Sequence, residues 1–133
     1  MRVEVGVDLV SVSRVAESVA RFGDRFLRRV FTDSEIAYAT ATPELAPERL
    51  AARFAAKEAA IKALGLVEHG VGWRQIEVER LTSGQCRLVL HGDARAAADR
   101  AGVNALSVSL THEGEYSAAV VIAMRDDPEK APQ

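Results

Sequence analysis

The sequence predicts an α+β fold in which a mostly antiparallel sheet packs against helices. Apolar and polar residues alternate with a period of two near both ends of the chain, which is typical of strands with one buried face. Short polar turns join the later strands in pairs, which indicates hairpins. The helical segments are grouped between strands rather than alternating singly with them, and this argues against a parallel, doubly wound sheet. The expected order is strand, three helices, two strands, helix, two strands.

The first strand is expected at the N-terminus. Its apolar residues alternate with glycine or charged residues, and they are Val3, Val5, Val7 and Leu9. The period of two predicts that these side chains face the core. Asp8 then points to the opposite face, near the C-terminal end of the strand.

Three helices are predicted next. The first extends to residue 30, although Gly23 interrupts its pattern. A capping-box sequence at residues 32–35 opens a short second helix. The third and longest helix covers residues 48–64, which are rich in good helix formers. Lys57 falls in the middle of its apolar stripe, where a lysine is costly unless the amine snorkels past the edge of the core.

The C-terminal half contains the remaining elements. They are strands at residues 75–81 and 86–90, a helix at residues 93–100, and strands at residues 105–111 and 116–124. Residues 1–125 are expected to form one domain. The final segment, residues 126–133, is polar and contains two prolines, so a flexible tail is expected there.

The composition excludes several classes of protein. A chain of 133 residues with 48% apolar content suits one core, and a net charge of −2 is not that of a general nucleic-acid binder. The single cysteine, Cys86, excludes a disulfide framework and a cysteine-only zinc site. The N-terminus lacks the apolar core of a signal peptide, and no run approaches the roughly 20 apolar residues of a membrane span. We therefore expect a cytoplasmic protein with no membrane partner.

Two carboxylates, Asp8 and Glu58, are candidate ligands of a magnesium ion. Mg²⁺ prefers oxygen ligands, and proteins usually hold it with one or two carboxylates while water and substrate phosphate fill the other positions. Lys62 follows Glu58 by one helical turn, where it could neutralise phosphate charge. Simpler interpretations stay open: Asp8 could cap the following helix, and Glu58 and Lys62 could form an exposed ion pair.

A cationic stripe is predicted on the first helix. Its members fall within about 60 degrees of arc, with the last at the border, and are Arg14, Arg21, Arg25, Arg28 and Arg29. A one-sided cationic surface on a chain of negative net charge indicates an acidic protein partner, and a solvated helix face is the alternative. Phe26 adjoins the stripe, although its helical phase favours the core.

Several ordered motifs resemble one family along nearly the whole chain. They are Val5-Gly6-Val7-Asp8-Leu9-Val10, Arg53-Phe54-Ala55-Ala56-Lys57-Glu58 within residues 50–65, and Val108-Ser109-Leu110-Thr111-His112. At these separations the sequence resembles the holo-acyl-carrier-protein synthases, the small trimeric class of 4'-phosphopantetheinyl transferases. The resemblance implies the fold of that family. It also implies transfer of the 4'-phosphopantetheine group of coenzyme A to a serine of an apo acyl carrier protein, with release of adenosine 3',5'-bisphosphate, as in fatty acid biosynthesis.

The resemblance further implies roles for individual residues. Asp8 and Glu58 would bind Mg²⁺ together with the pyrophosphate of coenzyme A, and Lys62 would contact phosphate and stabilise the leaving group. The remaining coenzyme A contacts would be Arg53, Gly65 and His112. The acidic helix of the carrier protein would be received by Arg14, Arg21, Arg25, Phe26 and Arg29. Active sites would lie between the subunits of a homotrimer, and the serine proton would go to a metal-bound water or to one of the two carboxylates.

Some positions depart from the family pattern. Glu4 and Ala52 stand where glycine is more frequent, but the resemblance implies no ligand contact at either position. The loop from Leu66 to Gly72 lacks the usual threonine-glycine pair, so phosphate contacts are not carried over to it. A catalytically inactive coenzyme A-binding or scaffolding trimer of the same fold is the alternative function. Retention of both carboxylates and Lys62 argues against it.

Overall fold

The computed structural model describes residues 1–67 and 69–126 and confirms the α+β class. The helices are α1 (Val12–Phe22), α2 (Asp24–Val30), α3 (Asp33–Thr40), α4 (Ala46–Leu64) and α5 (Gly92–Arg100), with single 3₁₀ turns at Pro43–Leu45 and Trp73–Gln75. The strands are β1 (Arg2–Ser11), β2 (Ile76–Arg80), β3 (Cys86–Leu90), β4 (Val103–Glu113) and β5 (Tyr116–Arg125). The predicted hairpins and the capping box at Thr32 and Glu35 are all present.

The predicted order holds apart from one additional helix. The expected first helix is divided at Gly23, whose φ of 55° lies in the region that favours glycine. The Gly23 amide donates to the Val19 carbonyl at 2.8 Å and ends α1, and α2 begins at the next residue. The arginines of the predicted stripe therefore lie on two helices rather than one.

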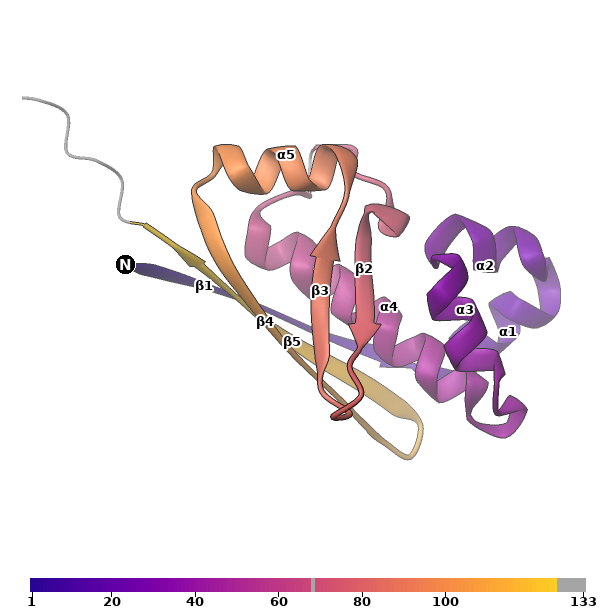
Figure 1. Cartoon of the computed structure of the whole chain (residues 1–133). Helices are drawn as coiled ribbons and strands as arrows, with labels where there is room; N and C mark the ends of the chain where they lie inside the picture. Colours follow the sequence, from indigo (N-terminus) through magenta and orange to yellow (C-terminus); the bar gives the residue numbers. More distant parts are fainter. Residues whose placement is uncertain (68, 127–133) are drawn as a thin grey trace, which may run out of the picture.

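The long strands form an antiparallel sheet in the order β1-β5-β4, and β2 and β3 form a separate antiparallel pair. Figure 1 shows α4 running across the three long strands, with α1, α2 and α3 gathered near its beginning and α5 near its other end. The residues of α4 that meet the sheet are small and buried: Ala55, Ala56, Ala59, Ala60 and Ala63. Short side chains let the helix axis lie close to the strands.

The closest approach of β1 to α4 occurs at Gly6. A Cβ atom added to Gly6 would lie 1.9 Å from the carbonyl oxygen of Ala59 and 2.9 Å from the amide nitrogen of Ala63, both of which are backbone atoms. Only glycine fits this position without displacing the strand or the helix. Asp8 follows on the same face of β1, because side chains two residues apart in a strand point the same way. The contact at Gly6 therefore aims Asp8 at α4.

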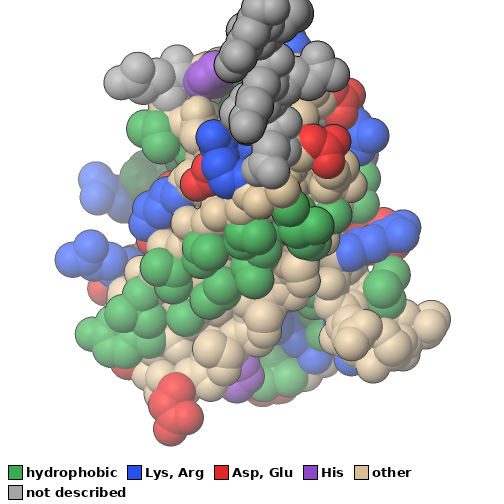
Figure 2. Space-filling model, turned by 90° about the vertical axis from the view of Figure 1, so that its left-hand side faces the viewer, with side chains coloured by type: hydrophobic (Ala, Val, Ile, Leu, Met, Phe, Trp, Pro, Cys, Tyr) green, Lys and Arg blue, Asp and Glu red, His purple; other side chains and the backbone are tan. Residues whose placement is uncertain are grey.

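The prediction of which face of the first strand is buried is wrong. Val3, Val5, Val7 and Leu9 are exposed by 50%, 62%, 58% and 64%, whereas Gly6 is buried. The face with glycine and Asp8 packs on the helix, and the apolar face is left uncovered in the single chain. Its partners across the β1–β5 register are also apolar and include Val120 and Ile122. We call these six residues the outer sheet face. Figure 2 shows hydrophobic side chains in a band across the side of the molecule turned to the viewer.

The described part of the chain has no helix that is both long and apolar enough to cross a membrane. The cytoplasmic location stays a prediction. Most of the predicted tail, residues 127–133, lies outside the described residues. Asp126 is described, and its carboxylate accepts a hydrogen bond from the Asn104 side chain at 2.8 Å.

We predict that Gly6→Ala lowers the free energy of unfolding by about 2 kcal/mol or more, because overpacking against backbone leaves no flexible group to move aside. Urea unfolding followed by circular dichroism measures the change. Gly72→Ala is the matched control, since Gly72 has an ordinary negative φ of −74° and open space around its Cβ position. That variant should be unchanged or more stable by about 0.5 kcal/mol. Equal behaviour of the two variants would contradict the packing argument.

Candidate functional site

Asp8 and Lys62 meet where β1 passes α4. The Lys62 ammonium lies 3.1 Å from Oδ1 of Asp8 and also donates to the Val7 carbonyl at 3.0 Å. The Asp8 side chain is 21% exposed and that of Lys62 is 51% exposed, so the pair is open to solvent from one side. Asp8 does not cap the next helix, because the Ser11 hydroxyl accepts from the Arg14 amide and is the N-cap of α1. The Asp8 carboxylate instead accepts from the Lys62 ammonium.

Glu58 lies on the same helix but has a different partner. Its Oε1 accepts a hydrogen bond from the indole Nε1 of Trp73 at 2.8 Å. The exposed Glu58–Lys62 pair considered from the sequence is replaced by two separate contacts, Lys62 with Asp8 and Glu58 with Trp73. Glu58 and Lys62 line a hollow of about 540 Å³ together with Arg29 and Trp73. We call it the Glu58 hollow.

The turn after α4 closes the Glu58 hollow. Gly65 ends the helix with φ 68°, in the left-handed conformation common at such ends, and lies between Lys62 and Leu66, which both line the hollow. The departing loop, Leu66 to Gly72, supplies further lining through Val67, Gly70 and Val71. The segment that differs from the family pattern thus borders the site directly.

The donor set of this region suits a hard cation that keeps other ligands. Within residues 1–67 and 69–126, no group of three or more histidine, cysteine, aspartate or glutamate side chains is arranged to hold a metal ion alone. Asp8 and Glu58 offer carboxylate oxygens only. Carboxylate ligands suit Mg²⁺, which commonly takes one or two carboxylates and completes its shell with water and substrate phosphate. The pair does not fit a structural zinc site, which needs four protein ligands.

Lys57 is buried rather than snorkelled. Its side chain is 0% exposed, and its ammonium lies 2.8 Å from Oε1 of Glu35, which is also 0% exposed. The same ammonium donates to the carbonyls of Trp73 at 3.0 Å and Ile76 at 2.6 Å. Burial lowers the pKa of Lys57, and the adjacent Glu35 opposes that shift. This ion pair joins α3 and α4 to the segment that carries Trp73.

Arg53 and His112 line a second hollow of about 300 Å³, the Arg53 hollow. The Arg53 guanidinium stacks 4.4 Å from the centre of the Tyr38 ring, and its Nε is buried and has no hydrogen-bond partner among the described residues. Burial lowers the pKa of Arg53. His112 lies at the end of β4, with Nδ1 3.3 Å from Oε2 of Glu48. Arg49 also stacks on Tyr38, so several cationic groups converge there.

The two hollows lie on opposite sides of α4 and share no lining residue. Arg53 and Lys62 are nine positions apart, which is about 13 Å along a helix axis and about 180 degrees around it. One chain therefore does not bring the predicted coenzyme A contacts into a single cavity.

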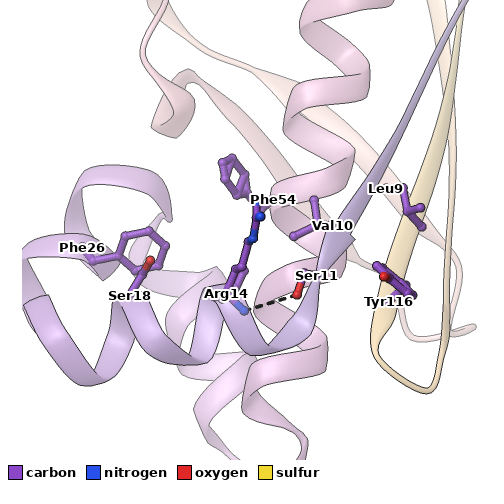
Figure 3. Close-up of a pocket in the computed structure, with 9 residues that line it drawn as sticks. Leu9, Val10, Ser11, Arg14, Ser18, Phe26, Phe54 and Tyr116 are labelled. Carbon is purple, nitrogen blue, oxygen red and sulfur yellow. Dashed lines mark hydrogen bonds between the residues drawn. The ribbon is translucent and has the colours of Figure 1, made fainter.

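Arg14 and Phe26 line a third hollow of about 460 Å³, the Arg14 hollow. Figure 3 shows the Arg14 side chain directed toward Phe54 of α4, with Phe26 on one side and Tyr116 of β5 on the other. Phe26 is only partly buried, so its core assignment was incomplete.

The predicted arginine stripe is divided among these places. Arg21 lies over the exposed ring of Phe22 at 5.2 Å from its centre, and Arg25 is exposed on α2. Arg29 lines the Glu58 hollow rather than the Arg14 hollow. The break at Gly23 turns α2 relative to α1, which explains why one continuous stripe is not formed.

Sequence reasoning missed several residues that line these hollows. Trp73 carries no charge and follows a loop, so neither residue type nor periodicity singled it out. Arg49 lies one turn before Arg53 on α4, but Tyr38 and Arg80 come from α3 and β2, and only the fold brings these two beside Arg53. Spacing in the sequence does not reveal that Tyr38 and Arg80 lie beside Arg53.

Comparison with known proteins identifies the family. Residues 4–121 match the family model described as ACPS, the 4'-phosphopantetheinyl transferase superfamily. The chain belongs to this superfamily. The matched segment contains every predicted site residue, from Asp8 to His112. The resemblance noted in the sequence is therefore confirmed.

Individual relatives agree with this assignment. A holo-[acyl-carrier-protein] synthase of Solibacter usitatus is 45% identical over 92% of this chain and 98% of its own length. One from Koribacter versatilis is 46% identical over 88% and 94%. A structure from Chronobacterium ammoniagenes, described as an ACPS–CoA complex, is 31% identical, covers 96% of this chain and 100% of its own, and superimposes with a TM-score of 0.85. The family likeness thus extends to the whole described fold.

Proposed function

We propose that this chain is a holo-[acyl-carrier-protein] synthase, which transfers the 4'-phosphopantetheine group of coenzyme A to a serine of an apo acyl carrier protein. The observation that carries the proposal is the meeting of Asp8 and Lys62 beside the Glu58 hollow, in a chain of the transferase superfamily. Glu58 and Lys62 line this open hollow, and Asp8 contacts Lys62. Such an arrangement of acidic groups and a cation suits a reaction in which a diphosphate is held and cleaved.

Asp8 and Glu58 are the proposed ligands of Mg²⁺. When bound, the ion would neutralise charge on the diphosphate of coenzyme A. The Lys62 ammonium, now paired with Asp8, would then contact phosphate and stabilise the leaving group.

The transfer forms one bond and breaks one. The serine oxygen of the carrier attacks the phosphorus that bears the pantetheine arm, and the bond from that phosphorus to the adenosine bisphosphate oxygen breaks. Adenosine 3',5'-bisphosphate leaves with the bonding electron pair. The serine proton passes to a water molecule or to one of the two carboxylates, Asp8 or Glu58. Because little covalent chemistry is required of the protein, alignment and charge neutralisation carry most of the catalysis.

Two of the proposed coenzyme A contacts, Arg53 and His112, come from a second subunit. Arg53 and His112 lie across α4 from Lys62 in the same chain, so they reach the same ligand only if a neighbouring copy presents its Arg53 hollow to this Glu58 hollow. Arg53 lines its hollow with a guanidinium group, which is a strong donor to phosphate oxygens. This geometry supports active sites at subunit interfaces.

A homotrimer is the proposed assembly. The outer sheet face exposes four large apolar side chains of β1 in one row, with further apolar residues on β5. Contiguous apolar surface of this kind generally marks a protein interface. Because this row lies on β1, the strand that carries Asp8, covering it with another copy brings that copy close to the site.

The Arg14 hollow is the proposed seat of the carrier protein. Arg14 supplies positive charge, and Phe26 and Phe54 supply apolar contact within the same hollow. Arg21 and Arg25 are exposed on α1 and α2, and their positive charge would steer an acidic helix toward this part of the molecule.

We predict that Glu58→Ala lowers the rate of carrier loading by about 100-fold or more, because one of two metal-holding carboxylates is lost. Mass spectrometry of apo carrier protein incubated with coenzyme A, with and without Mg²⁺, measures the product. Unfolding must stay cooperative in the variant. Full activity would overturn the metal assignment, and an inactive wild-type chain would favour the non-catalytic alternative.

We predict that Val5→Glu converts the assembly to monomers, because the 62% exposed Val5 side chain lies in the middle of the outer sheet face. Analytical ultracentrifugation measures the mass. Thr82→Glu, in the exposed turn between β2 and β3, adds the same charge elsewhere and should leave the trimer intact. A trimeric Val5→Glu variant would show that another surface holds the subunits.

We predict that Arg14→Glu weakens carrier binding by about tenfold or more and reduces its sensitivity to salt. Surface plasmon resonance with immobilised apo carrier protein measures the affinity, and calorimetry with coenzyme A should give an unchanged constant. Arg95→Glu on α5 is the matched control, because Arg95 pairs with Asp99 far along the chain from the Arg14 hollow. Equal loss of carrier and coenzyme A binding would indicate a structural role for Arg14.

A further inference from the structure

Trp73 contacts a proposed catalytic carboxylate through a group that carries no charge. Its indole Nε1 donates to Oε1 of Glu58 at 2.8 Å, and both residues line the Glu58 hollow. An indole N–H is a donor only and does not ionise. It can therefore hold a carboxylate oxygen in place while leaving the negative charge and the second oxygen, Oε2, available to a cation.

The position of Trp73 is determined at both its backbone and its ring. Its carbonyl accepts from the buried Lys57 ammonium at 3.0 Å, and Lys57 is itself held by Glu35. Its ring packs edge-on against Phe54, with centres 5.8 Å apart and planes at 81°. Donor, backbone and ring are thus fixed by three separate contacts.

The two carboxylates have different kinds of hydrogen-bond partner. Asp8 is contacted by Lys62, a cation that must turn toward phosphate during the proposed reaction. Glu58 sits on α4 with a neutral partner, and no ion pair of Glu58 is found among the described residues. Glu58 therefore keeps its orientation while Lys62 changes partners.

We infer that Trp73 is a positioning residue that orients the Glu58 carboxylate for a divalent cation, an inference that rests on the proposed metal role of Glu58. Partners that hydrogen-bond to metal-ligating carboxylates commonly contribute about 10- to 100-fold to metal affinity. Trp73 does not touch substrate in this scheme and acts only through Glu58.

The test measures cation binding rather than turnover. Free Mn²⁺ is quantified by electron paramagnetic resonance in the presence of coenzyme A, for the full chain and for Trp73→Phe, Glu58→Gln and the double variant. Trp73→Phe keeps an aromatic ring against Phe54 and the backbone bond to Lys57 but removes the indole donor. It should weaken Mn²⁺ binding about 10- to 100-fold. In the Glu58→Gln background the same substitution should change nothing further.

The outcomes separate this inference from the proposed function. Weak binding by Glu58→Gln together with wild-type affinity in Trp73→Phe would overturn the positioning role alone. A second equal loss in the double variant would also overturn it, because Trp73 would then act independently of Glu58. Wild-type affinity in Glu58→Gln would overturn the metal assignment and this inference with it.

A second measurement leaves the tryptophan in place, in case Trp73→Phe does not fold. Trp73 is the only tryptophan of the chain, so its indole N–H gives a single tryptophan side-chain resonance in ¹⁵N-labelled protein. Replacing Glu58 with glutamine should move the indole proton upfield, because a bond to a charged acceptor is lost. An unmoved resonance would overturn the inference.

Discussion

The site depends on the close approach of β1 to α4. Gly6 lets the strand backbone rest against the backbone of Ala59, and no other residue type fits there without a shift. This contact points Asp8 at the helix, where it meets Lys62, and it places the glycine side of β1 inward. The alanine-rich face of α4 serves the same end, because larger side chains would hold the strands away. Packing of the smallest side chains thus positions the most polar ones.

A single helix, α4, supplies functional groups to both of its sides. Glu58 and Lys62 face one hollow and Arg53 faces another, so on the proposed assembly one protomer would hold two halves of a ligand site that do not face each other. Lys57 lies between Arg53 and Glu58 in the chain, and its buried pair with Glu35 of α3, together with its bond to the Trp73 carbonyl, ties α4 to the Trp73 segment. Removing one member would leave an unpaired buried charge, which is far more costly than losing an exposed pair. Structural rigidity between the hollows is therefore built from charged groups.

Much of the fold follows from sequence patterns, and the errors have identifiable causes. Strands, hairpins, the capping box at Thr32 and the helix end at Gly65 depend on local rules and are all present. The sequence predicts that the apolar face of β1 faces the core, because alternation shows that one face is apolar. Alternation does not show which neighbour covers that face, and in the structure the glycine side is buried instead. The candidates Asp8, Glu58 and Lys62 follow from charge and family motifs, whereas the uncharged Trp73 and the Tyr38–Arg49 stack depend on tertiary contacts between distant segments. Gly23 interrupts the predicted helix pattern, but the pattern does not show that the chain forms two separate helices there.

The uncovered aliphatic row on β1 has a consequence for how much enzyme is working at any moment. On the proposed assembly, complete active centres exist only in associated copies, so their number follows the law of mass action and falls steeply when the protein is diluted. Specific activity then becomes a function of abundance, and a cell that makes few copies loses more than a proportional share of its capacity. Activity would therefore depend on the amount of protein synthesised in a threshold-like way, not in proportion to it.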